Sequence, residues 1–386
     1  MDTTVSKPTY LFYKNGGDVR EMLKKLPGAE PVPVSGEVTM AFLKGKEQAR
    51  LVFALPNRQL AKATALCRGM PEAEVFVLPA DVLPADASPI KIDPGKPRLD
   101  YMETEVSEFC NLNCRGCCDF SNLATEKKLY PFEEFRADLA ALKGLFWGVE
   151  KIRLMGGEPL LNPALAAYAE ETRAVFPDCD LRVVSNGLLL PKASEETLQR
   201  LRAAGVRFDI SNYPPTRKKK KEIVSVLENA GIGYDLGFPM DFFFKNILAH
   251  PNADPEPAFQ NCIFTHCHMM GHGRLAPCSY AYCIGRFNER FGTDYPENDY
   301  IDLHDPGMDG WEIARAFSRP HAFCRCCGKA IIPIRWKGHV SARAARPEDW
   351  QIRDGFLTTG VGPFIQRALK PAAAKLRGVI QRRNGG

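Results

Sequence analysis

The sequence contains no long run of apolar residues. Its first twenty residues include charges at Asp2, Lys7, Lys14 and Asp18 and leave no apolar stretch of signal-peptide length. No later segment approaches the roughly 20 apolar residues that a membrane-spanning helix needs. Internal repeats and low-complexity tracts are also absent, whereas 45% hydrophobic and 25% charged residues are typical of a soluble globular protein. We therefore expect a cytoplasmic globular protein.

Acidic residues are missing from the C-terminal segment 361–386. This segment holds six basic residues, and the chain has a net charge of +5, so the remainder carries 5 − 6, or −1. A nearly neutral body gives no reason to expect a nucleic-acid partner. Apolar residues between the bases give the tail a partly amphipathic pattern, which predicts either contact with an anionic surface or a frayed terminal helix.

The length of 386 residues predicts two or three domains, and the pattern of elements divides the chain into four regions. We expect a small α/β domain over residues 1–95, a core of alternating strands and helices over 96–245, a cysteine-rich extension over 246–345 and the basic tail over 346–386. The elements predicted for the first region are strands at 9–13, 49–54 and 74–78, helices at 19–26 and 59–67, and a linker at 79–97.

Strands alternate with helices in the second region, which predicts a parallel sheet with right-handed crossovers. The strands are expected at 99–106, 151–155, 181–185, 207–211 and 234–237, and the helices at 132–145, 163–175, 194–204 and 217–230. Such a unit resembles an open or closed β/α barrel, where chemistry gathers at the carboxyl ends of the strands. Polar motifs follow the first three strands: a cysteine group, Gly156–Pro159 and then Ser185–Gly187.

Thirteen cysteines is a high and odd number, and in a reducing cytosol such residues serve metals or catalysis more often than disulfides. Cys67 and Cys179 stand alone and are predicted to be buried small hydrophobes. The other eleven fall into two groups: Cys110, Cys114, Cys117 and Cys118, and then Cys262, Cys267, Cys278, Cys283, Cys324, Cys326 and Cys327.

The first group places Cys110, Cys114 and Cys117 where three thiolates can hold three corners of a four-iron cluster. The fourth iron is then left open to bind something that reacts. Cys118 is adjacent to Cys117, and neighbouring residues usually point in different directions, so we predict that it is not a ligand. A structural zinc or a simple electron-transfer cluster is the alternative for this loop.

The cysteine spacing resembles that of the radical S-adenosylmethionine (SAM) superfamily, and other residues extend the resemblance. Gly156, Gly157, Glu158 and Pro159 match the motif that in this family contacts the methionyl amino group of SAM. Ser185, Asn186 and Ser211 fall where the family places polar contacts to the ribose and carboxylate. The resemblance covers about residues 99–240 and implies a partial (β/α)6 barrel that binds a 4Fe-4S cluster and S-adenosylmethionine.

The resemblance also implies an activity. The reduced cluster would cleave S-adenosylmethionine, and the resulting 5′-deoxyadenosyl radical would remove a hydrogen atom from the substrate. A reducing partner such as a flavodoxin or ferredoxin would supply the electron. The two glycines fit because their missing side chains let the backbone approach a ligand.

The second cysteine group resembles the SPASM and Twitch extensions of radical SAM enzymes, which carry auxiliary 4Fe-4S clusters. The predicted ligands are Cys267, Cys278, Cys324 and Cys327, with Cys262 as the replacement. Zinc is the alternative metal, because His266, His268 and His272 surround Cys267 and imidazole suits zinc. The third alternative is that the cysteines of this group are reduced thiols that bind no metal.

The predicted function is hydrogen abstraction from an unactivated C–H position. An auxiliary cluster that accepts an electron from the substrate radical makes the net reaction an oxidation. If no cluster forms there, a thiol such as Cys283 would instead return a hydrogen atom to the radical, which makes the reaction an epimerisation. A small metabolite or a sugar or polysaccharide precursor is the favoured substrate, since residues 1–95 do not resemble a winged-helix peptide-binding module. The alternatives are a peptide-modifying enzyme, a non-enzymatic iron-sulfur protein and a zinc scaffold.

Overall fold

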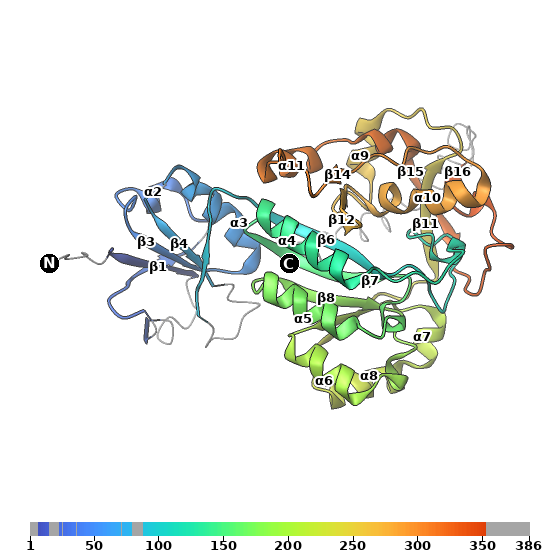
Figure 1. Ribbon diagram of the computed structural model, residues 1–386, viewed down its shortest axis with the longest axis horizontal. Helices are drawn as coiled ribbons and strands as arrows, with labels where there is room; N and C mark the ends of the chain where they lie inside the picture. The colour runs from blue at the N-terminus through green and yellow to red at the C-terminus, as the bar shows by residue number, and fades with distance from the viewer. Residues whose placement is uncertain are drawn as a thin grey trace.

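The computed structural model describes residues 7–14, 23–24, 26–35, 37–70, 72–78 and 88–352. A small N-terminal unit lies at one end of an elongated molecule, and the remaining elements form a larger body (Figure 1). Most of the helix predicted at 19–26, the linker residues 79–87 and the tail from residue 353 onward lie outside the described residues. No helix in the described part of the chain combines the length and the hydropathy that crossing a membrane requires.

The N-terminal unit contains a five-stranded sheet of order β2-β1-β3-β4-β5, in which only β5 is antiparallel to its neighbour. Helix α3 (Asn57–Ala65) confirms the second predicted helix, while β2 and the short helix α2 (Met40–Leu43) were not expected. The strands are β1 (Thr9–Lys14), β2 (Glu30–Val34), β3 (Arg50–Ala54), β4 (Glu74–Val77) and β5 (Ile90–Ile92).

The main sheet has eight strands in the order β10-β9-β8-β7-β6-β12-β13-β14. Strands β6 to β10 are parallel and follow the order of the sequence, as predicted. The strands are β6 (Arg98–Ser107), β7 (Gly148–Gly156), β8 (Asp180–Ser185), β9 (Arg207–Ile210), β10 (Tyr234–Leu236), β12 (Met269–Gly271), β13 (Arg274–Ala276) and β14 (Ile301–Asp302).

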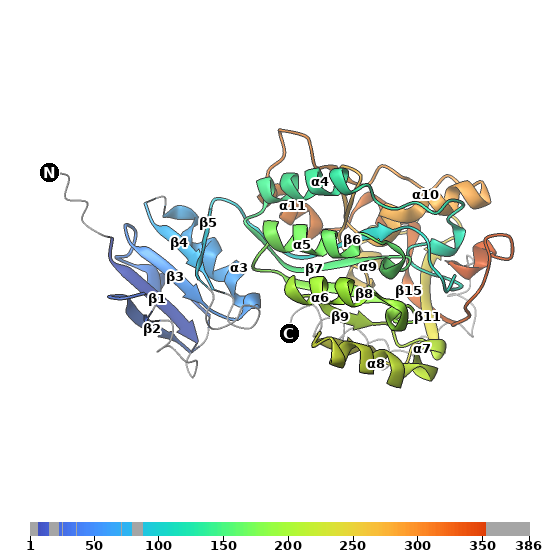
Figure 2. The same ribbon diagram turned by 60° about the horizontal axis from the view of Figure 1, so that its bottom comes forward.

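Helices cover one face of this sheet (Figure 2). Their apolar stripes pack on alternate strand residues such as Met102, Ile152 and Val183, which belong to one buried core. The helix predicted at 217–230 is divided into two at Lys219. The helices are α4 (Phe132–Leu145), α5 (Leu165–Val175), α6 (Glu195–Ala203), α7 (Pro214–Lys218) and α8 (Lys220–Asn229).

The opposite face of the sheet is polar and is also buried. Tyr101 and Glu103 of β6 alternate with the core-facing residues, and Arg153 of β7 donates to the Tyr101 hydroxyl at 2.7 Å. Arg153 also pairs with Asp209 of β9 at 2.8 Å, and Asp209 pairs with Arg182 of β8 at 2.7 Å. Charged residues from four strands therefore form one network on the face that a β/α barrel encloses.

The cysteine-rich extension shares the main sheet. Strand β12 pairs in parallel with β6, and a tight turn at His272 and Gly273, with φ of 51° and 73°, leads into the antiparallel strand β13. Residues on both sides of the boundary predicted at 245 thus contribute to one sheet. Strand β6 lies between β7 and β12 rather than at an edge.

A separate three-stranded sheet has the order β15-β11-β16. Strand β11 follows β10 in the sequence but pairs with β15 and β16, so hydrogen-bonded pairing of the main sheet within the described residues ends at β10 and β14. The remaining elements are β11 (Phe242–Leu248), α9 (Pro255–Asn261), α10 (Ser279–Phe291), α11 (Gly310–Phe317), β15 (Cys327–Arg335) and β16 (Gln351–Ile352).

Candidate functional site

The first three cysteines lie in a loop between β6 and α4, which we call the cysteine loop (residues 108–123). It begins at the carboxyl end of β6, the position predicted for the chemistry of a parallel sheet. Asn113 and Gly116 adopt left-handed conformations, with φ of 47° and 71°, and these allow the backbone to turn between the cysteines. Cys114 is buried, while Cys110 and Cys117 are partly exposed.

The glycine motif after β7 packs directly on the start of the cysteine loop. The Gly157 amide donates to the carbonyl of Ser107 at 2.7 Å, and the Glu158 amide donates to the carbonyl of Phe109 at 3.0 Å. A Cβ added at Gly157 would lie 2.2 Å from the Phe109 carbonyl oxygen, and one at Gly156 would lie 2.2 Å from that of Ser107. Both glycines are therefore required by the close approach of two backbone segments.

Glu158 is hydrogen-bonded to the residues at the carboxyl end of β8. Its carboxylate is fully buried and accepts hydrogen bonds from the Ser185 hydroxyl at 2.7 Å and the Asn186 amide at 2.9 Å. The Asn186 side chain in turn donates to Asn111 of the cysteine loop at 2.7 Å. The Glu158 side chain thus binds protein groups and links the glycine motif to the end of β8.

The residues predicted to contact S-adenosylmethionine converge at one edge of the sheet. Ser211 follows β9, is partly exposed, and donates its amide to the Ser185 carbonyl at 2.9 Å. Gly156–Pro159, Ser185, Asn186 and Ser211 therefore follow three adjacent strands, beside the cysteine loop. Sequence order alone brings these groups together, because adjacent parallel strands end on the same side.

The thiols of the cysteine loop fit a metal cluster. Burial raises the pKa of Cys110 to about 12 and also raises that of Cys114, and each of these thiols is further affected by the charge of Cys117. In contrast, a hydrogen bond from the Cys118 thiol lowers the pKa of Cys117 to about 6. Buried thiols whose charges act on one another need a cationic partner to ionise together, and iron ions supply one.

Cys118 belongs to this loop, and Cys283 lies beside it. The Cys118 thiol contacts Asp119 at 3.5 Å, in addition to its hydrogen bond to Cys117. Cys283 of α10 is buried, and its sulfur lies within 4.8 Å of carboxylate oxygens of Glu105 and Asp119. Arg286 neutralises Glu105 through two hydrogen bonds, of 3.0 and 2.6 Å. Cys283, which was predicted as a hydrogen donor in case the second cysteine group binds no cluster, therefore lies next to the cysteine loop.

Burial raises the pKa of the Glu158 carboxyl to about 7, against an ordinary value of 4.5. The folded protein then holds a proton there that the unfolded chain releases, so this residue's contribution to stability is lost as pH rises from 4.5 through 7. We expect the free energy of unfolding of the metal-free wild type to fall between pH 5 and 8 by roughly 3 kcal/mol more than that of Glu158→Gln. Urea unfolding at the two pH values measures this difference.

The matched control is Glu133→Gln, because Glu133 is an exposed carboxylate on α4, with 80% of its side chain accessible. This variant should retain the pH dependence of the wild type. Equal pH dependence in Glu158→Gln and the wild type would contradict the assignment.

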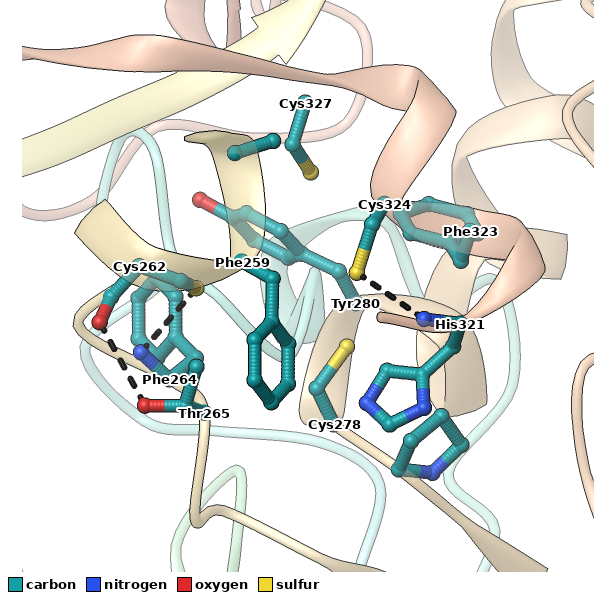
Figure 3. A pocket seen from close by; sticks show the side chains of 12 residues that line it. Phe259, Cys262, Phe264, Thr265, Cys278, Tyr280, His321, Phe323, Cys324 and Cys327 are labelled. Atoms are coloured by element: carbon teal, nitrogen blue, oxygen red, sulfur yellow. Dashed lines mark hydrogen bonds between the residues drawn. The ribbon is translucent and has the colours of Figure 1, made fainter. Parts of the chain in front are cut away.

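The second cysteine group forms a pocket, which we call the thiol pocket. Four cysteines line it, and Figure 3 shows their sulfurs facing the same space: Cys262, Cys278, Cys324 and Cys327. They come from the end of α9, the start of α10, and the turn into β15. Burial raises the pKa of Cys262 to about 11 and raises the pKa of the other three thiols. As in the cysteine loop, a cation would let the four ionise together.

Three members of the predicted ligand set line the thiol pocket: Cys278, Cys324 and Cys327. Cys267 does not line the thiol pocket, whereas Cys262, the predicted replacement, does. Cys267 immediately precedes the residue whose carbonyl accepts the Glu103 amide at 2.7 Å, and this bond ties it to β6. Burial raises the pKa of Cys267, and the charges of Glu103, Cys262 and Cys278 raise it further.

The three histidines predicted as zinc ligands also lie outside the thiol pocket. His268 is buried, stacks on Phe317 with ring centroids 4.3 Å apart, and has its pKa lowered to about 3 by burial. His272 pairs with Glu134 at 3.0 Å. The zinc reading of Cys267 with its flanking histidines therefore has no common site among the described residues.

Sequence reasoning missed two residues of the thiol pocket. His321 lines it, and its position three residues before Cys324 was the available signal. Tyr280 lines it as well, and its hydroxyl is buried with no hydrogen-bond partner among the described residues. An orphaned buried donor in a thiol-lined pocket fits a group that offers acceptor sulfurs.

Comparison with known proteins finds a family match for the region of alternating strands and helices. Residues 104–223 match the Radical SAM superfamily. A GTP 3′,8-cyclase of Sulfurovum sp. (strain NBC37-1) is 35% identical over 122 residues, which cover 29% of this chain and 34% of that protein. A GTP 3′,8-cyclase of Campylobacter jejuni (strain RM1221) is 30% identical over 171 residues, covering 43% and 52%. The chain thus spans about a third to a half of the length of these curated relatives.

Solved structures give a weaker likeness. BtrN in complex with AdoMet and 2-DOIA is 17% identical, with a TM-score of 0.36 over 57% of this chain and 87% of that one. Native anSMEcpe with bound AdoMet is 10% identical, with a TM-score of 0.39 over 73% and 100%. These scores are too low to transfer any residue role. The family match and the arrangement of the cysteine loop agree, and residues 104–223 therefore form a radical SAM domain.

Proposed function

We propose that this chain is an enzyme that uses S-adenosylmethionine and a 4Fe-4S cluster to abstract a hydrogen atom from its substrate. The observation that carries this proposal is the convergence of the cysteine loop, the Gly156–Pro159 turn and Asn186 at one edge of the parallel sheet. An electron-transfer protein needs the thiolates but has no need of the glycine turn wedged against them.

Each group has a proposed role. Cys110, Cys114 and Cys117 hold three irons of the cluster, and the backbone of Gly156–Pro159 with Ser185, Asn186 and Ser211 binds S-adenosylmethionine. When bound, the reduced cluster supplies the electron that cleaves S-adenosylmethionine to a 5′-deoxyadenosyl radical.

The thiol pocket is the proposed site of an auxiliary 4Fe-4S cluster of the SPASM or Twitch kind. Cys262, Cys278, Cys324 and Cys327 are its proposed ligands, since all four line one pocket. Four thiolates close a cluster, so this one would exchange electrons or help to hold the substrate instead of binding S-adenosylmethionine.

A small polar molecule is the proposed substrate, either a metabolite or a sugar or polysaccharide precursor. The support is the polar network of Glu103, Arg153 and Asp209 on the inner face of the sheet, which suits a substrate rich in hydrogen-bonding groups. Peptide modification is the alternative. The relatives' name, GTP 3′,8-cyclase, indicates a nucleotide as a further candidate substrate to assay.

The net reaction is proposed to be an oxidation if the auxiliary cluster accepts an electron, or an epimerisation if Cys283 returns a hydrogen atom. Cys283 lies next to the cysteine loop, and this position supports epimerisation as the second proposed reaction. A flavodoxin or ferredoxin in the cytoplasm is the proposed reductant.

Cofactor cleavage tests the proposal. Anaerobically reconstituted and reduced protein should convert S-adenosylmethionine to 5′-deoxyadenosine and methionine, which liquid chromatography measures. A protein with an intact reduced cluster but no 5′-deoxyadenosine would be an electron carrier. Purified protein containing zinc without iron or sulfide would instead support the scaffold alternative.

A further inference from the structure

The segment after β15 runs along the cysteine loop. We call it the strap (residues 336–350). Its backbone is hydrogen-bonded to the loop at three places: the Arg115 amide donates to Lys337 at 2.8 Å, the His339 amide donates to Leu112 at 2.6 Å, and the Val340 amide donates to Asn113 at 2.9 Å. These loop residues lie between Cys110 and Cys117, so the strap fixes the backbone that presents the thiols.

A tryptophan at each end of the strap reaches a ligand cysteine. The indole N–H of Trp350 donates to the carbonyl of Cys117 at 2.7 Å, and its ring is fully buried against Phe120, with centroids 5.6 Å apart. The indole nitrogen of Trp336 is buried and has no nitrogen or oxygen partner among the described residues. The Cys114 thiol is the group that this indole contacts.

The strap also approaches the loop too closely for a larger residue. Gly116 has a φ of 71°, and a Cβ there would lie 3.0 Å from the Asp349 carbonyl oxygen. The guanidinium of the adjacent Arg115 donates to the carbonyl of Arg335 at 2.9 Å. Arg335 is the last residue of β15, and the loop also contacts α10, where Arg286 donates to the Asp119 carbonyl at 2.7 Å.

The strap connects the two thiol sites through one continuous stretch of chain. Strand β15 begins at Cys327, which lines the thiol pocket, and ends at Arg335, immediately before Trp336. Its pairing with β11 fixes the direction in which it leaves the pocket. The position of the strap therefore depends on the C-terminal region, although its contacts are with the radical SAM domain.

We propose that the strap holds the cysteine loop in the shape that binds the first cluster, with Trp350 and Trp336 as positioning residues for Cys117 and Cys114. This inference rests on the proposed function of the loop as a 4Fe-4S site. It assigns to the C-terminal region a structural role at the first site, in addition to any electron transfer.

Trp350→Phe tests the retention of the cluster. The variant keeps an aromatic ring and loses the bond to Cys117, so we expect iron to leave the first cluster for a chelator about three- to tenfold faster. The first cluster is recognised by the electron paramagnetic resonance signal that changes when S-adenosylmethionine is added. Trp311→Phe is the matched control, because its indole N–H donates to the Gly95 carbonyl at 2.6 Å, away from the loop.

Trp336→Phe tests the contact with sulfur. Hydrogen bonds to cluster sulfurs stabilise the reduced, more electron-rich state. We expect the midpoint potential of the first cluster to become more negative by a two- to tenfold change in the reduction equilibrium, which is about 20 to 60 mV for one electron. A redox titration followed by electron paramagnetic resonance measures this shift, and Trp311→Phe should leave the potential unchanged.

Gly116→Ala provides a variant of the loop itself, with Gly28→Ala as its control. Both glycines have positive φ, 71° and 82°, but a Cβ at Gly28 meets no atom within 4 Å. Gly116→Ala should lose iron faster and Gly28→Ala should not, even if Trp350→Phe proves too unstable to purify. Wild-type rates and potentials in Trp350→Phe, Trp336→Phe and Gly116→Ala would overturn the inference, whereas a wild type that binds no cluster would instead refute the proposed function.

Discussion

Replacing Gly157 by alanine should weaken the binding of the first cluster. The new Cβ would lie 2.2 Å from the carbonyl oxygen of Phe109, 2.3 Å from its carbonyl carbon and 2.8 Å from the amide nitrogen of Cys110. All three are backbone atoms that no rotamer change can move, so the start of the cysteine loop must shift. We expect a loss of stability of about 1–3 kcal/mol and a fall in 5′-deoxyadenosine formation of about 100-fold, the size expected when catalytic groups move by about 1 Å.

Gly144→Ala is the control for this substitution. Gly144 lies near the end of α4, and a Cβ there meets no atom within 4 Å, so alanine should leave stability unchanged or raise it by about 0.5–1 kcal/mol. Iron content, thermal unfolding and cofactor cleavage should be compared for both variants. A Gly157→Ala protein that keeps the iron and activity of the wild type would show that the turn and the loop are not in contact.

Replacing Cys262 by alanine should remove the auxiliary cluster, whereas replacing Cys267 should not. Cys262 lines the thiol pocket with three other cysteines, while Cys267 is tied to β6 through the backbone of its neighbour. Loss of one ligand of a four-thiolate site should reduce the iron content from about eight to about four atoms per chain. Iron and sulfide analysis after anaerobic reconstitution measures this change.

The two cysteines are five residues apart, so Cys267→Ala is a close control for local unfolding. Cys324→Ala should reproduce the effect of Cys262→Ala, because it lines the same pocket from the opposite end of the extension. If Cys267→Ala loses the cluster and Cys262→Ala retains it, the ligand set deduced from the sequence is correct and the one deduced from the pocket is wrong.

The first site could be predicted from the sequence because a short cysteine motif and a regular order of strands and helices define it. The spacing of Cys110, Cys114 and Cys117 lies within one loop, and regular alternation of strands and helices places Gly156 and Ser185 at neighbouring strand ends. No long-range contact has to be known to bring these groups together. The expected strands β6 to β10 are accordingly confirmed in order and direction.

The thiol pocket was only partly accessible because its ligands come from distant segments. Whether Cys262 or Cys267 faces Cys324 depends on where α9 ends and on the turn in which the Cys267 amide donates to Phe264 at 3.0 Å. The strap was not foreseen at all, since backbone hydrogen bonds carry no mark in the side-chain pattern. Its residues were assigned to an extension and a tail.

Placing β12 beside β6 has a consequence for how the protein folds. The strand that leads into the cysteine loop is bonded on both sides, so a chain cut near residue 245 would leave β6 with a row of unsatisfied amides and carbonyls. The stretch 104–223 that matches the Radical SAM superfamily thus leaves out β12, one of the two strands paired with β6. Denaturation should open both halves of the eight-stranded sheet in a single transition.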